Sequence, residues 1–167
     1  MRRFVNFLSL SRIVLGLVFS YIVLYFNSNP LSLVFIFILV VLSDYFDGVI
    51  ARKYSISNDF GGRVDVISDF IFIFLSSSSL VLVSRIPFWY LFILVFEILE
   101  FFLSSHYLDK LYYDDFGHYT SLMFYAFPIF IIVFNFPNTV TLFLSLLISF
   151  SSLFSSYLRF KYILSVK

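Results

Sequence analysis

The sequence predicts an all-α polytopic membrane protein with six transmembrane helices and both termini in the cytoplasm. Of its 167 residues, 61% are hydrophobic and only 13% are charged, well below the roughly 25% that is typical of soluble domains. The mean hydropathy is +1.00. Asn, Pro and charged residues divide the chain into six apolar segments, each near the ~20 residues that a spanning helix needs. We expect one membrane domain over residues 1–167.

The first three helices are expected at about residues 7–27, 31–52 and 62–84. The first follows Met1-Arg2-Arg3; because Arg12 interrupts its apolar run and no small-residue cleavage site follows, we interpret it as a retained helix and not a signal peptide. It ends at the break FNSNP, and Pro30 stands where the second helix would start. The break KYSISNDFG separates the second helix from the third, and RIP ends the third.

The last three helices are expected at about residues 88–105, 118–135 and 139–160. Pro87 and Pro137 lie where the fourth and sixth would start, a position at which the missing N–H of proline costs least. The polar loop HYLDKLYYDDFGH separates the fourth helix from the fifth, and its flanking His106 and His118 are interpreted as surface residues.

The basic residues predict the orientation. Threading six helices with the first residues in the cytoplasm leaves ten of the eleven Lys and Arg inside and only Arg85 outside. The protein is therefore expected in the cytoplasmic membrane, with the loop after the second helix facing the cytoplasm. A net charge of +1 gives no field that would attract nucleic acid, and zero cysteines exclude disulfides, thiolate metal sites and a cysteine nucleophile.

Four aspartates stand out in this apolar chain. Asp44 and Asp47 close the second helix three residues apart, while Asp65 and Asp69 open the third four residues apart, so each pair lies on one helix face. A connection of about ten residues would make these helices antiparallel neighbours whose acidic faces meet. Four converging carboxylates repel one another unless protons or cations intervene.

Cations of a particular kind suit this cluster. Oxygen-only ligands favour Mg²⁺ or Mn²⁺, four carboxylates are enough for two ions, and paired ions are common in displacement at phosphorus. Gly48 and Ala51 leave one face flat for a ligand, and Arg52 offers a fork of donors to phosphate oxygens. Gly61 allows close approach at the start of the third helix. A proton or ion pathway and structural ion pairing are the alternatives from spacing alone.

The pattern as a whole resembles a known signature. Asp44-x-x-Asp47-Gly48-x-x-Ala51-Arg52, eight further residues and Gly61-x-x-x-Asp65-x-x-x-Asp69 match every fixed position of the CDP-alcohol phosphatidyltransferases. Upstream, VNFLSLSRI is similar to the family's Pro-Asn-x-Leu-Thr-x-x-Arg, with Asn6, Ser9 and Arg12 at matching positions. Val5 stands in place of the proline and Ser9 in place of the threonine.

This resemblance implies transfer of a phosphatidyl group, or an archaeal-type equivalent, from a CDP-linked lipid to a small polar alcohol, with release of CMP. It implies that Asp44, Asp47, Asp65 and Asp69 ligate two ions, Mg²⁺ or Mn²⁺, and that Asp69 is also the catalytic base. The CDP-lipid contacts that it implies are Asn6, Ser9, Asp47, Gly48, Ala51, Arg52 and Gly61. A homodimer is expected by analogy alone. The rival from another class is a small ion or proton transporter, and a third reading is an inactive relative that acts as an assembly partner.

For the acceptor alcohol we favour serine or another amino alcohol, with glycerol 3-phosphate or inositol phosphate as the alternative. Phe70 follows the last aspartate, where members that make phosphoglycerol lipids commonly have lysine, and this counts against glycerol 3-phosphate. Glu97 and Glu100 share a face of the fourth helix and could hold the ammonium of serine or another amino alcohol, or pair with Arg63 or Arg12. Arg159 could instead contact the phosphate of glycerol 3-phosphate or inositol phosphate. The candidate acceptor contacts are Arg63, Glu97, Glu100 and Arg159.

Overall fold

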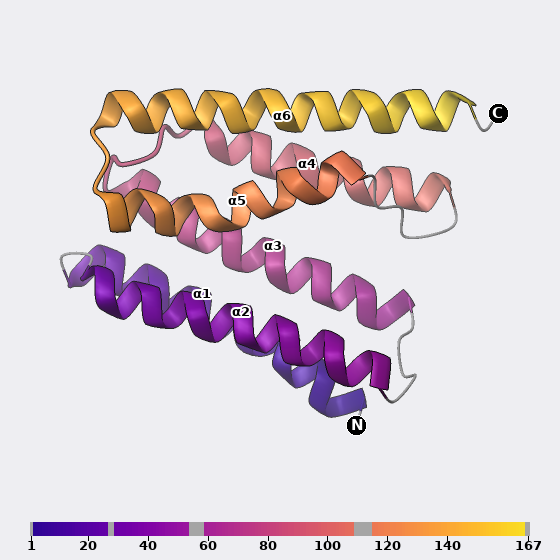
Figure 1. Ribbon diagram of the computed structural model, residues 1–167, viewed down its shortest axis with the longest axis horizontal. Coiled ribbons are helices and arrows are strands. Elements are labelled where there is room, and N and C mark those ends of the chain that lie inside the picture. Colours follow the sequence, from indigo (N-terminus) through magenta and orange to yellow (C-terminus); the bar gives the residue numbers. More distant parts are fainter. Residues whose placement is uncertain (1, 27–28, 54–58, 109–114, 166–167) are drawn as a thin grey trace. The chain divides into compact units, whose positions relative to one another are not determined.

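The computed structural model describes residues 2–26, 29–53, 59–108 and 115–165, with side chains at 7–26, 29–50, 61–108 and 116–165. The described residues form six helices and no strand (Figure 1). These are α1 (Arg2–Tyr25), α2 (Pro30–Lys53), α3 (Asp59–Leu82), α4 (Tyr90–Tyr107), α5 (Asp115–Phe134) and α6 (Asn138–Ser165). All six are long and apolar enough to cross a membrane, so the predicted all-α membrane fold is confirmed.

The helices follow the predicted breaks, although α1 starts at Arg2 and not at residue 7, and α6 runs to Ser165 and not to residue 160. Pro30 is the first residue of α2 and Pro137 directly precedes α6. Pro87 lies in a turn instead, and α4 begins only at Tyr90, whose N–H donates to the Pro87 carbonyl at 3.1 Å. Ser84 and Asn135, just after α3 and α5, have φ of 58° and 45°, the left-handed conformation that commonly ends a helix.

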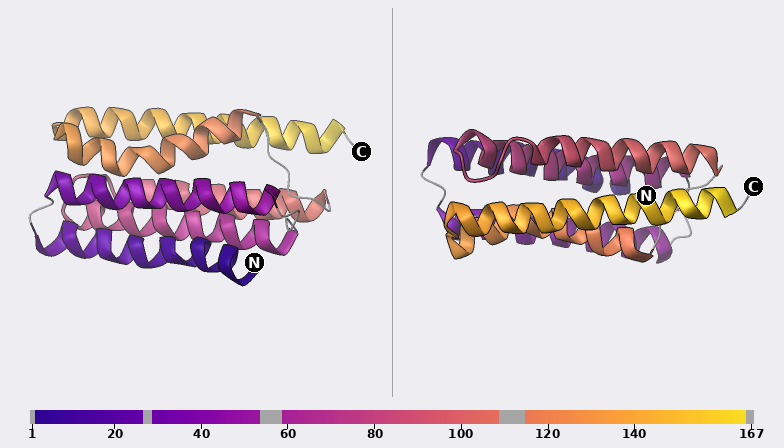
Figure 2. Two further views of the ribbon diagram at one scale, coloured as in Figure 1. Left: turned by 60° about the horizontal axis from the view of Figure 1, so that its bottom comes forward. Right: turned by 90° about the horizontal axis from the view of Figure 1, so that it is seen from above.

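The chain divides into two compact units, residues 1–83 and 84–167. In the first unit α1 packs closely against both α2 and α3, and the three helices run alongside one another (Figure 2). Helices α2 and α3 meet through their acidic faces, as expected, since carboxylate oxygens of Asp44, Asp65 and Asp69 lie within 4.8 Å of one another, while the closest backbone packing of each is with α1. Helix α1 is their shared partner.

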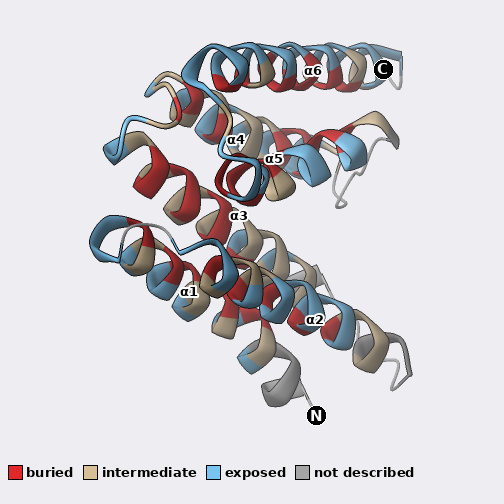
Figure 3. Ribbon diagram, turned by 60° about the vertical axis from the view of Figure 1, so that its left-hand side comes forward, coloured by how far each residue is buried: buried red, intermediate tan, exposed pale blue. Residues whose placement is uncertain are grey.

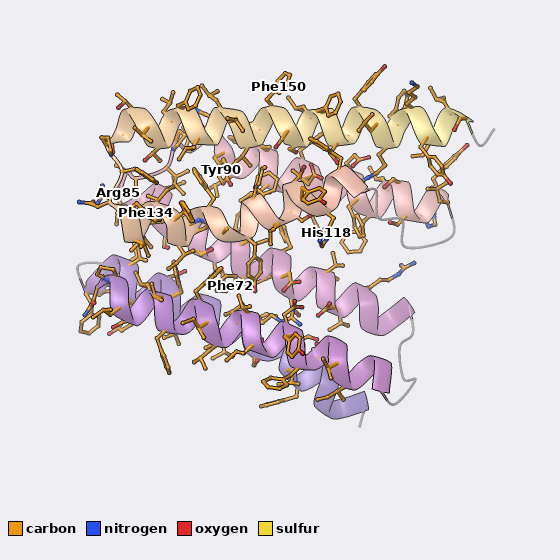
Figure 4. The ribbon with its side chains drawn as sticks, in the orientation of Figure 1. Phe72, Arg85, Tyr90, His118, Phe134 and Phe150 are labelled. Atoms are coloured by element: carbon orange, nitrogen blue, oxygen red, sulfur yellow. The ribbon has the colours of Figure 1, made fainter. Side chains whose placement is uncertain are left out.

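Small residues on α1 explain its close approach to α3. A Cβ on Gly16 would lie 3.3 Å from the Cα of Phe72 and 3.2 Å from Cδ1 of Leu75. One turn later, the Ser20 hydroxyl lies 2.9 Å from the Leu75 carbonyl oxygen, and the buried rings of Phe19 and Phe72 meet edge to face with their centroids 6.1 Å apart. Figure 4 labels Phe72. This is the small-xxx-small pattern that lets two membrane helices meet backbone to backbone.

In the second unit α6 packs against both α4 and α5. Figure 3 shows α6 with buried residues along one side and exposed residues along the other. The buried side is mostly small and polar and includes Ser145, Ser149, Ser152 and Ser155. Phe150 is 74% exposed and projects away from the unit (Figure 4). Small residues inside and aromatic residues outside are the arrangement expected of helices surrounded by lipid.

Candidate functional site

Three of the four signature aspartates come together at one place in the first unit. Asp44 on α2 and Asp65 and Asp69 on α3 each offer a carboxylate oxygen, and these oxygens all lie within 4.8 Å of one another. Asp44 is exposed, whereas Asp65 and Asp69 are half-buried. The spacing of four residues on α3 places its two carboxylates one helical turn apart on a single face.

Asp47 belongs to the same cluster but is buried behind it. Its Oδ2 accepts a hydrogen bond from the Ser9 hydroxyl at 2.5 Å and one from Nη2 of Arg12 at 3.1 Å. Its Oδ1 is buried and has no hydrogen-bond partner among the described residues. The Ser9 oxygen also lies 3.5 Å from Oδ1 of Asp65, so α1 contacts both acidic helices.

Arg12 on α1 connects all four aspartates. Its side chain is 0% exposed, and its Nη1 donates to Asp69 and lies 3.3 Å from Oδ1 of Asp44. Its Nη2 lies 2.5 Å from Oδ1 of Asp65 and also contacts Asp47. Sequence reasoning placed Arg12 in a motif but did not predict these contacts. The available signal was a charged residue inside an apolar span, where charges are expected to find partners.

The donor set of the cluster fits hard divalent cations. Four carboxylates face one guanidinium, so the cluster holds three more formal negative charges than positive ones. Asp44, Asp65 and Asp69 present carboxylate oxygens to a common point, and the unpartnered Oδ1 of Asp47 is a further buried acceptor. Oxygen-only sites of this kind suit Mg²⁺ or Mn²⁺. These four residues are the ones that would hold such ions.

The remaining signature residues lie near this cluster in sequence. Gly48 and Gly61 are half-buried, close to the end of α2 and the start of α3, and Arg63 is exposed on the first turns of α3. The side chains of Asn6, Ala51 and Arg52 lie outside the described residues. His106 and His118 are exposed, in accord with their interpretation as surface residues (Figure 4 labels His118).

A second buried charge cluster lies in the other unit. The Arg159 side chain of α6 is 3% exposed, and its Nη1 donates to Oε2 of Glu100 at 2.6 Å. Its Nη2 lies 3.9 Å from Oε1 of Glu97, and Oε2 of the same glutamate accepts a hydrogen bond from the Ser152 hydroxyl. Both glutamates are thus paired with Arg159, because α4 packs against α6.

Comparisons with known proteins agree with the signature. The family model described as CDP-alcohol phosphatidyltransferase matches residues 3–155. The chain is 36% identical over 72 residues to the CDP-diacylglycerol–glycerol-3-phosphate 3-phosphatidyltransferase of Rickettsia typhi, an alignment that covers 41% of this chain. The match spans only 39% of that relative's own length. No solved structure matches this chain.

Proposed function

Because this chain belongs to the CDP-alcohol phosphatidyltransferase family, we propose that it transfers a phosphatidyl group from a CDP-linked lipid to a small polar alcohol. The new bond joins the alcohol oxygen to the lipid phosphorus, the bond from that phosphorus to the CMP oxygen breaks, and CMP leaves. The observation that carries this proposal is the meeting of Asp44, Asp65 and Asp69 with oxygens within 4.8 Å of one another. Phospholipid synthesis is the setting that this reaction implies.

Each aspartate has a role in the proposal. Asp44, Asp47, Asp65 and Asp69 would hold two divalent ions, which would neutralise the diphosphate and make CMP a better leaving group. Asp69 also takes the proton from the attacking hydroxyl, because a carboxylate within hydrogen-bond reach can serve as a general base. Its position, half-buried and held by Arg12, keeps the carboxylate fixed while leaving part of it accessible.

Binding of the CDP-lipid is assigned to residues around the aspartates. Gly48 and Gly61 leave space for the close approach of the nucleotide, and Arg52 is proposed to contact the diphosphate. Ser9 acts by donating its hydroxyl to Asp47, which fixes the orientation of that carboxylate. Asn6 and Ala51 complete the set that the family signature indicates.

We propose glycerol 3-phosphate as the first acceptor to test, with serine and inositol phosphate as competitors. The relative from Rickettsia typhi is named for glycerol 3-phosphate. Glu97 and Glu100 are both bound to Arg159, so they are less available to hold the ammonium of serine than their sequence positions suggested. Exposed Arg63, two residues before Asp65, is the basic side chain best placed in sequence to meet an acceptor phosphate.

The location follows from the distribution of basic residues. We propose that the protein lies in the cytoplasmic membrane with the aspartates at its inner edge, where a lipid and a water-soluble alcohol can meet. A homodimer is proposed from family analogy alone.

The test is CMP release by the purified protein in detergent. CDP-diacylglycerol and its ether-lipid analogue are offered with glycerol 3-phosphate, serine, inositol or inositol phosphate, in Mg²⁺, Mn²⁺ or EDTA. We expect metal-dependent release with one acceptor. Absence of release from folded protein with every acceptor would favour the transporter reading, in which no CMP is formed.

Substitution of the base sharpens this test. Asp69→Asn should abolish transfer while binding of CDP-diacylglycerol stays measurable, because the amide cannot accept the proton. Asp109→Asn, between α4 and α5, is a control that should leave turnover unchanged. Turnover of Asp69→Asn close to that of the wild type would remove Asp69 as the base.

A further inference from the structure

Arg12 differs from Arg63, the other basic side chain that the structure describes in the first unit, which is exposed. Arg12 is completely buried, and its two terminal nitrogens reach carboxylates on two different helices. Nη1 contacts Asp44 of α2 and Asp69 of α3, while Nη2 contacts Asp47 of α2 and Asp65 of α3. Each nitrogen therefore bridges the same pair of helices.

We infer that Arg12 is a built-in counter-cation of the acidic cluster: it positions the four carboxylates and keeps α2 and α3 assembled when divalent ions are scarce. Arg12 is thus a positioning residue and acts through the aspartates. This inference rests on the proposed metal site and adds to it a role for a residue on α1.

Electrostatics gives the reason for a fixed cation here. Four carboxylates brought together repel one another, most strongly around buried Asp47, and separation of the helices would relieve that repulsion. A bound divalent ion opposes this only while its concentration is sufficient. The guanidinium is part of the chain, is always protonated, and carries donors in a rigid fork that can serve several carboxylates at once. Its contribution therefore does not vary with ion concentration.

The packing of α1 supports the same role. Gly16, one turn after Arg12, and Ser20 bring α1 against Phe72 and Leu75 of α3, and α1 packs against α2 as well. The position of the guanidinium is thus set by backbone contact. A shorter or flexible cation would not span both acidic pairs, because lysine offers one point of charge in place of two separated nitrogens.

The second unit supplies a matched control. Arg159 is also buried and also binds two carboxylates, but its acidic partners come from one helix and are not part of the proposed metal site. Loss of Arg159 should lower stability by an amount that divalent ions do not change. Loss of Arg12 should lower it by an amount that divalent ions restore.

The experiment measures thermal unfolding in detergent by circular dichroism, for wild type, Arg12→Gln and Arg159→Gln, each with EDTA and with Mn²⁺. In EDTA we expect both variants to melt about 10 °C below wild type. Addition of Mn²⁺ should recover most of the loss in Arg12→Gln and little in Arg159→Gln, and it should raise the melting temperature of Arg12→Gln by more than that of wild type, which binding of the ions also stabilises. A Mn²⁺ response of Arg12→Gln no larger than that of wild type overturns the inference.

A double variant covers failure of Arg12→Gln to fold. Arg12→Gln/Asp69→Asn removes one negative charge along with the positive one. In EDTA it should therefore have a higher melting temperature than Arg12→Gln, or be purified as folded protein where Arg12→Gln is not. If neither variant can be purified as folded protein, or if the double variant is no more stable than Arg12→Gln, the inference is wrong. CMP release by wild type, measured alongside, tests the proposed function separately, because the melting result does not depend on turnover.

Discussion

The buried cluster around Arg159 allows a sharp test of whether these residues bind the acceptor or hold the second unit together. Arg159→Met removes the cation and keeps most of the side-chain volume. Glu97 and Glu100, whose side chains are 13% and 20% exposed, would then be left without their positive partner. The guanidinium also lies 5.5 Å from the ring centre of Phe101, a contact that methionine replaces only in part.

The expected cost follows from this geometry. Breaking a buried ion pair by removing one partner typically costs about 3–5 kcal/mol, since the other charge stays buried without compensation. For a chain of this size that corresponds to a fall in melting temperature of about 10 °C. The charge-balanced variant Arg159→Met/Glu97→Gln/Glu100→Gln should regain most of the loss, because no uncompensated charge remains.

The assay uses the single tryptophan of the chain, Trp89, which lies directly before α4 and so reports on the second unit. Its fluorescence is followed during heating in detergent. Arg85→Met is the control: Arg85 bonds to Asn135 at an exposed site, and its loss should cost less than about 0.5 kcal/mol.

Enzyme kinetics decide between the two roles. If the cluster is structural, the KM for the acceptor in folded Arg159→Met should stay close to that of wild type. A variant with wild-type melting temperature and a strongly raised acceptor KM would refute the reasoning and assign Arg159 to the acceptor site.

Two further predictions concern α1 packing and membrane orientation. Gly16→Leu should lower the free energy of unfolding by about 1–3 kcal/mol and reduce CMP release, because the new side chain would press on the Phe72 backbone. In Gly16→Ala, the gain in helix propensity should offset much of a smaller clash. A Gly16→Leu protein with the melting temperature and turnover of wild type would count against close α1–α3 packing. Because the chain has no cysteine, Ser84→Cys and Arg63→Cys can be labelled singly in intact cells with an impermeant maleimide. Labelling at 84 and not at 63 is expected from the positive-inside pattern, and the reverse would invert the proposed orientation.

The helices could be predicted from the sequence because each one depends on the residues within its own segment. A run of about 20 apolar residues satisfies its own backbone as a helix in lipid, and proline, asparagine or charge marks where it ends. Pro30 and Pro137 marked their helix starts well. Pro87 did not, because a turn held by the Tyr90 N–H intervenes.

The candidate site was predictable in part. The spacing of the aspartates indicated two acidic faces, and Asp44, Asp65 and Asp69 do present oxygens to one another. Gly16 was missed, although an isolated glycine four residues before Ser20 is the small-xxx-small signal of close helix packing.

The sequence by itself determined which segments are helical and which residues carry negative charge, since both are set within one or two turns of chain. Only the tertiary structure decided the partners. Arg12 meets Asp69 across 57 positions and Arg159 meets Glu100 across 59, distances in sequence that no local pattern spans. The physical reason is that helix packing, through small residues such as Gly16, selects which faces meet, and a buried charge then binds whatever opposite charge that packing brings within reach.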